Sequence, residues 1–318
     1  MRRRKVRWSP ANFRAISNWL SSFTAGTRFS ARRLAARRPI YRYEDEFGNT
    51  FIVKFYGDDP VTQEEKFKRM DKEFRGIIFL RERGLDKPPY LVVKAYGERP
   101  DLDFAIAEEE VRGDQLINLI VNATRRGTDI SREVKALANL LSIIHRAAPA
   151  DSKWWIPDWK KRVTEAISPY KPADDLLELG KKWVAFFPLP FSAVPLHGDP
   201  NPTNIAYDGG NIVAMDLQMF HYGYALEDVS EVAAELRHLF AQYANNPWLA
   251  EPYIGLLFSA YSKASGTSFT DLTDFNPFYM GLWELEIASN PWISPGQRNW
   301  LVGEAYRCWK YGLLRLRR

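Results

Sequence analysis

A short polar segment in the second half of the chain carries the residues best suited to chemistry. His197-Gly198-Asp199 is followed five residues later by Asn204 and, beyond an apolar stretch, by Asp216. Phosphoryl transfer requires a carboxylate that orients the attacking hydroxyl and accepts its proton, and oxygen ligands for the Mg²⁺ that neutralises a polyphosphate. Two aspartates and an asparagine provide these groups, so the residue types and their order predict a phosphoryl-transfer site.

The residues between Asn204 and Asp216 predict how these two side chains meet. Residues 208–211 read Asp-Gly-Gly-Asn, which favours a tight turn between the apolar segments at Ile205 and residues 212–215. A β-hairpin at this point brings Asp216 back beside Asn204. The alternative is a polar loop whose Asp and Asn side chains only cap their own turns. The match between the motif and its flanking strands favours a functional site.

A second hairpin is expected nearer the N-terminus. Residues 40–46 and 50–56 are rich in strand-forming types and flank Phe47-Gly48-Asn49, a good turn sequence. Side chains alternate along a strand, so Lys54 shares a face with Ile52 while Val53 takes the other face. Lys54 therefore points to where a cleft is expected.

The order of the remaining elements predicts an α+β, bilobal fold with a small antiparallel sheet and a larger helical lobe. A helix follows Thr62, which stands at capping-box spacing from Glu65, and strands are expected at residues 90–96 and 104–108. Arg112-Gly113-Asp114 marks a break, after which helical periodicity dominates. We divide the chain into a basic arm at residues 1–36, a nucleotide-binding sheet lobe at 37–110 and a helical lobe at 111–318. Further helices are expected around residues 134–144, 229–240, 253–264, 276–288 and 296–313.

With these motifs the sequence resembles the aminoglycoside phosphotransferase and choline kinase family of protein-kinase-like phosphotransferases. The family motif is His-Gly-Asp followed by an Asn and a later Asp, and the separation of Asp199 and Asn204 is also that of the protein-kinase catalytic loop. The resemblance covers about residues 37–265. It extends to Glu73 within Lys72-Glu73-Phe74-Arg75, to the connector at 107–113, to the helix ending at His145 and to the turn ending at Asp228.

The resemblance implies a role for each motif residue and a need for ATP and Mg²⁺. Asp199 would be the catalytic base, and Asn204 and Asp216 would be the metal ligands. Lys54 would bind the α- and β-phosphates of ATP, with Glu73 as its ion-pair partner. The adenine would bind the backbone of the connector at Glu109, Glu110 and Val111.

One segment departs from the family pattern. The loop that covers the nucleotide is usually rich in glycine, whereas residues 31–39 contain four arginines and no glycine. Either arginine side chains replace the backbone N–H groups, or the loop lies elsewhere, at residues 21–26.

Charge and hydropathy leave the partners open. Residues 1–38 contain eleven Arg and Lys and no Asp or Glu, whereas the remaining 33 basic and 39 acidic residues give −6. The arm is either a solubilising tail or a site for an anionic partner such as nucleic acid, a phosphate-rich substrate or a membrane surface. No apolar run is long enough to span a bilayer, so we expect a cytoplasmic protein without a transmembrane segment.

The sequence thus predicts an ATP-dependent enzyme that phosphorylates a hydroxyl of a small molecule. Two alternatives remain: a nucleotide-binding pseudokinase with a regulatory role, and a binder of nucleic acid or anionic membranes that uses the arm. Residues 150–318 hold 19 acidic and 15 basic side chains, a difference too small to indicate the charge of the acceptor.

Overall fold

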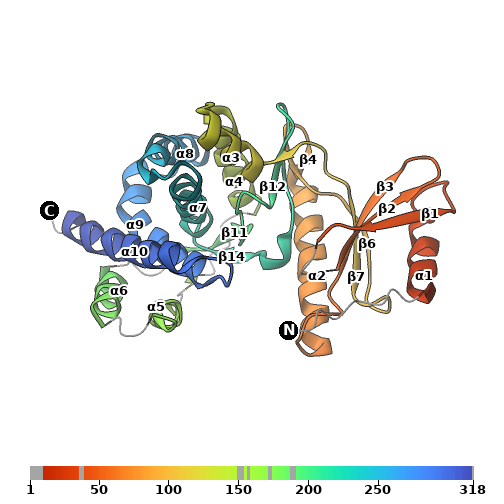
Figure 1. The fold of residues 1–318 in the computed structure, drawn as a ribbon, viewed down its shortest axis with the longest axis horizontal. Coiled ribbons are helices and arrows are strands. Elements are labelled where there is room, and N and C mark those ends of the chain that lie inside the picture. The colour runs from red at the N-terminus through yellow and green to blue at the C-terminus, as the bar shows by residue number, and fades with distance from the viewer. Residues whose placement is uncertain are drawn as a thin grey trace.

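A computed structural model describes residues 10–35, 39–148, 154–155, 158–170, 174–186 and 191–316. Two lobes lie side by side, a sheet lobe on the right of Figure 1 and a helical lobe on the left, with the N-terminal helix at the far edge of the sheet lobe. The α+β architecture, with an antiparallel sheet and a larger helical part, is therefore confirmed.

The sheet of the first lobe has five antiparallel strands in the order β1-β2-β3-β7-β6. Their bounds are β1 Phe29–Arg33, β2 Ile40–Asp45, β3 Thr50–Phe55, β7 Ala105–Glu109 and β6 Ala95–Arg99. One face carries Tyr43, Phe51 and Val53, and the helix α1 (Pro10–Leu20) covers it with Ile16 and Leu20. The predicted hairpin of β2 and β3 is present, with Tyr43 opposite Phe51.

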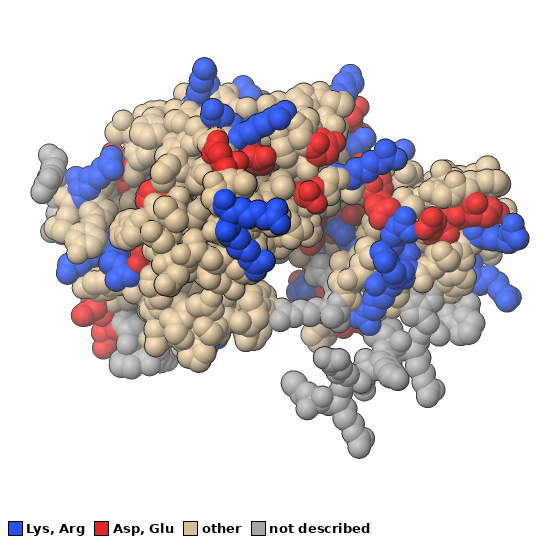
Figure 2. Space-filling model, turned by 45° about the horizontal axis from the view of Figure 1, so that its top comes forward, with Lys and Arg blue, Asp and Glu red and all other residues tan. Residues whose placement is uncertain are grey.

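The arm predicted at residues 1–36 contains a helix and a strand in its described part. Residues 10–33 form α1 and the edge strand β1, because their apolar side chains pack on the sheet and β1 pairs with β2 from Phe29 to Arg33. Residues 1–9 and 36–38 lie outside the described residues. On the face shown in Figure 2, basic and acidic side chains lie next to one another over the sheet lobe.

The other face of the first sheet looks onto α2 (Gln63–Leu80), which starts at Thr62 as predicted, where the Thr62 side chain accepts a hydrogen bond from the Glu65 N–H. A π-helical turn, η1 (Arg81–Leu85), follows α2, and Gly84 takes the positive φ of 95° that ends it.

A second five-stranded sheet joins distant parts of the chain in the order β4-β5-β13-β12-β8. Its strands are β4 Asp86–Lys87, β5 Tyr90–Val92, β13 Ile212–Ala214, β12 Ile205–Tyr207 and β8 Asp114–Gln115. β5 runs parallel to β13, whereas the other pairs are antiparallel. The predicted boundary at residue 110 is thus crossed, since residues 86–92 pair with strands from the second half of the sequence.

The helical lobe is built on long, largely buried helices. The predicted periodic segments lie in α4 (Ser131–His145), α7 (Leu226–Ala244), α8 (Glu251–Ser265), α9 (Phe269–Ser289) and α10 (Pro295–Leu316). At its core, Trp309 of α10 stacks on Phe278 of α9 and donates its indole N–H to the Phe278 carbonyl. None of the described helices is both long and apolar enough to cross a membrane.

The remaining elements are short. The other helices are α3 (Leu116–Arg126), α5 (Trp159–Ile167), α6 (Asp174–Phe186) and the 3₁₀ turns η2 (Leu217–Met219) and η3 (Pro247–Ala250). Two strand pairs complete the fold, β9 (Trp154–Trp155) with β10 (Phe191–Ser192) and β11 (Val194–Leu196) with β14 (His221–Gly223).

Candidate active site

The loop that carries Asp199 is anchored by a buried aspartate of α7. Asp228 accepts hydrogen bonds from the backbone N–H groups of His197, at 2.8 Å, and Gly198, at 3.0 Å. His145 Nε2 lies 3.0 Å from the same carboxylate. Burial alone would raise the pKa of Asp228, but the hydrogen bond and charge of His145 and the backbone N–H groups lower it. Asp228 therefore stays ionised and holds the loop.

Gly198 is the point at which this loop turns. Its φ is +83°, and a Cβ here would lie 2.3 Å from the carbonyl oxygen of Met219. No other residue fits this close approach without moving the backbone, so the glycine of the His-Gly-Asp motif is required by packing as well as by conformation.

The predicted convergence of Asp199 with Asn204 is present. The Asn204 side-chain amide donates to the Asp199 carbonyl at 2.9 Å and to Asp199 Oδ2 at 3.1 Å. Asn201 donates to the other carboxylate oxygen at 2.6 Å. Both oxygens of Asp199 are thus held in place, which orients the carboxylate toward a substrate.

The hairpin brings Asp216 to the same place. Ile205 of β12 pairs with Ala214 of β13, and the Met215 N–H donates to the Asn204 carbonyl at 2.8 Å. Asp216 adopts a left-handed backbone with φ of +60°, a strained conformation for a residue other than glycine. Its Oδ1 is buried and has no hydrogen-bond partner among the described residues. Such an oxygen suits a divalent cation.

Asn204 and Asp216 fit Mg²⁺ better than a metal ion whose ligands all come from protein side chains. In the described part of the chain, no group of three or more His, Cys, Asp or Glu side chains is arranged to hold a metal ion. Mg²⁺ commonly takes one or two protein oxygens and completes its shell with waters and substrate phosphates. Asp216 and the amide oxygen of Asn204 match this pattern.

Lys54 forms a buried cluster with two glutamates. Its Nζ lies 2.6 Å from Glu73 Oε1 and 3.0 Å from Glu108 Oε2, and all three side chains are more than nine-tenths buried. Burial opposes the charge of Lys54, but the charges of Glu108, Glu73 and Asp216 raise its pKa. Burial raises the pKa of Glu73 to about 8 although Lys54 opposes this. Three acidic side chains, Glu73, Glu108 and Asp216, thus surround Lys54.

Glu108 was not among the predicted site residues. It belongs to β7, where Ile106 is paired with Lys54 and Glu108 with Ile52, so both β7 side chains share the face of Lys54. The sequence feature that could have indicated a buried acid is the position of Glu108 directly after the apolar run Ala105-Ile106-Ala107. Its significance depends on the pairing of β3 with β7, which the local sequence does not encode.

The segment after Asp216 packs on α2 and so links the two halves of the site. Gly76 of α2 faces Phe220, where a Cβ would lie 2.9 Å from the ring, and the Phe79 and Phe220 ring centres are 5.6 Å apart. Glu73 lies one turn before Gly76 on the same helix. The helix that bears Glu73 is therefore fixed against the segment that bears Asp216.

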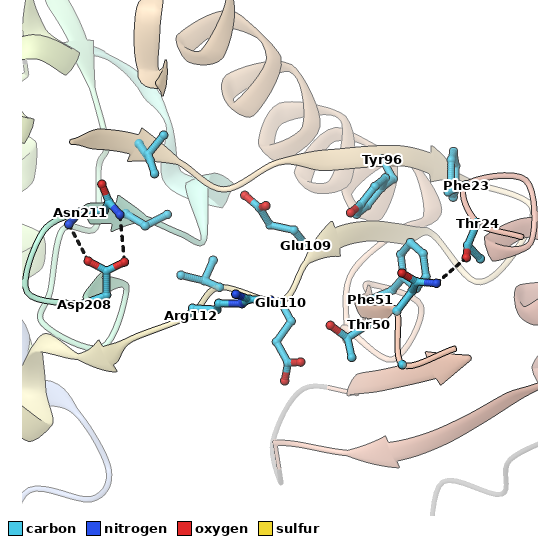
Figure 3. A pocket seen from close by; sticks show the side chains of 15 residues that line it. Phe23, Thr24, Thr50, Phe51, Tyr96, Glu109, Glu110, Arg112, Asp208 and Asn211 are labelled. Carbon is cyan, nitrogen blue, oxygen red and sulfur yellow. Dashed lines mark hydrogen bonds between the residues drawn. The ribbon is translucent and has the colours of Figure 1, made fainter. Parts of the chain in front are cut away.

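The side chains of the connector lie apart from this cluster. Glu109 Oε1 accepts from the Lys94 N–H at 2.7 Å, and Glu110 pairs with Arg42 at 2.7 Å. Glu109, Glu110 and Val111 line a pocket of about 490 Å³ together with Phe51 and Tyr96, as Figure 3 shows. Among the described residues, neither Lys54 nor any residue of the His-Gly-Asp motif lines this pocket.

A separate cavity of about 560 Å³ opens beside Asp199, between the motif loop, α7 and α9. Four acidic side chains line it, and no Lys or Arg does so among the described residues: Asp199, Glu231, Glu235 and Glu286. The cavity thus adjoins the predicted base and carries negative charge.

Comparison with known proteins gives the family of this chain. A family model described as "APH: Phosphotransferase enzyme family" matches residues 33–252. The chain belongs to this phosphotransferase family. The resemblance inferred from the His-Gly-Asp motif is therefore confirmed, and no curated protein matches the sequence.

Solved structures of this kind share the fold across nearly the whole chain. A protein from Ralstonia eutropha JMP134, provisionally named an aminoglycoside phosphotransferase, is 14% identical with a TM-score of 0.65, covering 94% of this chain and 97% of its own. Amicoumacin kinase in complex with AMP-PNP and Ca²⁺ is 15% identical with a TM-score of 0.57, covering 92% and 93%. Choline kinase from Cryptosporidium parvum Iowa II is 11% identical with a TM-score of 0.57, covering 95% of each chain.

Proposed function

We propose that the protein is an ATP-dependent phosphotransferase that moves the γ-phosphate onto a hydroxyl of a small molecule. The observation that carries this proposal is the convergence of Asp199, Asn204 and Asp216 between the Lys54 cluster and the cavity at Asp199. A family phosphotransferase with this arrangement has a place for the polyphosphate on one side of Asp199 and for the acceptor on the other.

Each residue then has a defined task. Asp199, fixed by Asn201 and Asn204, orients the acceptor hydroxyl and accepts its proton as the oxygen attacks the γ-phosphorus and ADP leaves with the electrons of the broken P–O bond. Mg²⁺ bound at Asn204 and Asp216 would neutralise the phosphate charge.

The other lobe positions the nucleotide. Lys54 would contact the α- and β-phosphates, with Glu73 and Glu108 setting the position of its ammonium group. The adenine would bind the backbone of Glu109, Glu110 and Val111. The two acidic side chains are already engaged, Glu109 with the backbone N–H of Lys94 and Glu110 with the Arg42 guanidinium. Because the reaction consumes ATP, we propose that it takes place in the cytoplasm.

The test is Mg²⁺-dependent transfer from ATP to a panel of hydroxyl compounds. Asp199→Asn and Asp216→Ala should each lower turnover at least about 100-fold, while Asp101→Asn, at an exposed turn, should match the wild type. Equal turnover in all four proteins would refute the assignment. Binding of ATP without any transfer would instead support a regulatory pseudokinase.

A further inference from the structure

Arg42 of β2 lies on the same face of the first sheet as Lys54. It is paired with Ile52 of β3, and Ile52 stands two residues before Lys54 on that strand, so the three side chains share one face. Two residues along a strand span about 7 Å, which separates the row of Arg42 and Ile52 from that of Lys54. Because Phe51 is paired with Glu109 at the end of β7, this displacement is toward the connector.

The side chain of Arg42 reaches across β3. Its Nε donates to Glu110 Oε1 at 2.7 Å, and a second guanidinium nitrogen donates to Glu44. Since β3 lies between β2 and β7, the pair of Arg42 and Glu110 spans two strand spacings, about 10 Å. Glu110 also forms a hydrogen bond with Thr50 of β3. The Arg42 side chain therefore lies along the surface of the sheet and meets Glu110 over β3.

The carboxylates engage only the edge of the Arg42 guanidinium. Its N–H groups point outward in one plane, so these hydrogen bonds leave the flat surface that is turned away from the sheet available. The Arg42 side chain is 24% exposed, and that of Glu110 is 35% exposed. An ion pair exposed to this degree adds little to stability. A ligand at the flat surface explains an arginine at this position better than folding does.

The base of the nucleotide would bind next to this guanidinium. Glu110, which contacts Arg42, is one of the three connector residues whose backbone would bind adenine. In Figure 3 the side chains of Glu109 and Glu110 point to opposite sides of the connector. The side of Glu110 is that of Lys54, because Glu110 contacts Arg42 on this face. A nucleotide with its base at the connector and its phosphates at Lys54 therefore passes over Arg42.

We propose, resting on the proposed use of ATP, that the Arg42 guanidinium stacks on the base of the nucleotide and sets the preference for a purine. Guanidinium groups stack on aromatic faces, and the attraction grows when water is excluded from the contact. A purine presents two fused rings to this surface and a pyrimidine presents one, so a purine nucleotide gains the larger contact. Two carboxylates already balance the charge of Arg42, which leaves stacking as its contribution to binding.

The experiment separates stacking from attraction to the phosphates. Calorimetry measures the dissociation constants of Mg-ADP and of inorganic tripolyphosphate in the full-length protein. Arg42→Met removes the plane and the charge, whereas Arg42→Lys keeps the charge without the plane. Both variants should weaken ADP binding about tenfold and change tripolyphosphate binding less than about twofold. An Arg42→Lys protein that binds ADP like the wild type, or equal losses for ADP and tripolyphosphate, would overturn the proposal.

The preference for purines provides a second measurement. Wild-type kcat/KM for ATP should exceed that for CTP, which also carries an exocyclic amine, at least about tenfold, and Arg42→Met should bring this ratio toward one. Arg99→Met is the matched control, because Arg99 forms an exposed ion pair with Asp101 on β6 and should keep the wild-type ratio. A ratio that stays at the wild-type value in Arg42→Met would contradict the role of Arg42. Unchanged tripolyphosphate binding shows that the variant is folded.

The same measurements distinguish this inference from the proposed function. ADP binding that weakens in both Arg42 variants, in a protein that transfers phosphate to no compound, would refute the phosphotransferase function and keep the base contact. Transfer from ATP with one KM in the wild type and both variants would refute the base contact and keep the function. A wild-type protein that does not bind ADP would refute both.

Discussion

Lys54 and Glu73 form an ion pair of 2.6 Å between β3 and α2, and both side chains are more than nine-tenths buried. If Lys54 positions the phosphates, Lys54→Met should lower kcat/KM for ATP at least about 100-fold, because the phosphates lose their fixed contact. The assay is steady-state kinetics in ATP. Lys68→Met, on the exposed face of α2 and paired with Glu64, serves as the matched control. A Lys54→Met protein with normal ATP kinetics would exclude this role.

Asp216 offers a test of the metal site. Asp216→Asn keeps the shape of the side chain but removes its charge, so the Mg²⁺ concentration for half-maximal turnover should rise about tenfold or more. A Mg²⁺ titration at saturating ATP measures this directly. The exposed Asp86→Asn should titrate like the wild type. Identical curves for all three proteins would place the metal elsewhere.

A comparison of Gly198 with Gly209 distinguishes the cost of a left-handed backbone from the cost of a steric clash. Both have positive φ, of +83° and +88°, but a Cβ at 198 meets the Met219 carbonyl at 2.3 Å whereas nothing lies within 4 Å of one at 209. Gly209→Ala should cost about 1 kcal/mol of unfolding free energy, and Gly198→Ala at least about 2 kcal/mol with loss of turnover. Urea unfolding measures both. Equal losses of unfolding free energy in the two variants would show that the loop at residue 198 moves to accommodate a Cβ without further cost.

Asp228 should be one of the most sensitive positions for stability. Asp228→Ala leaves the His197 and Gly198 N–H groups and His145 without their acceptor, and we expect a loss of about 3–5 kcal/mol. Asp228→Asn retains the shape and should lose less. Urea unfolding together with amide exchange at residues 197 and 198 provides the measurement. Wild-type stability of Asp228→Ala would contradict the anchoring role.

The sequence predicted the parts of the site that depend on nearby residues. Asp199, Asn204 and Asp216 converge because a hairpin turn at 208–211 is encoded locally, and Lys54 points inward because side chains alternate along β3. The Lys54–Glu73 pair also follows from the family pattern. The hairpin and the direction of Lys54 need only short-range rules, whereas the pair with Glu73 was implied by the resemblance.

The parts that were missed depend on contacts between distant segments. Glu108 reaches Lys54 only through the β3–β7 register, and residues 10–33 join the sheet only because α1 finds an apolar face to cover. The composition did not indicate that the cavity beside Asp199 is lined by acidic residues. Arginines such as Arg125 and Arg162 contact aromatic residues of this cavity but do not line it. Overall charge could not reveal which side chains a cavity gathers.

The parallel pairing of β5 with β13 has a consequence for how the chain unfolds. Residues 90–92 precede the connector, yet their ladder runs along residues 212–214 and continues at each end, where the Ile212 N–H donates to Pro89 and the Val93 N–H to Ala214. A fragment ending at residue 111 would lack this partner strand. We therefore expect the two lobes to melt in one cooperative transition, and a chain cut at the connector to fold only when both pieces are present together.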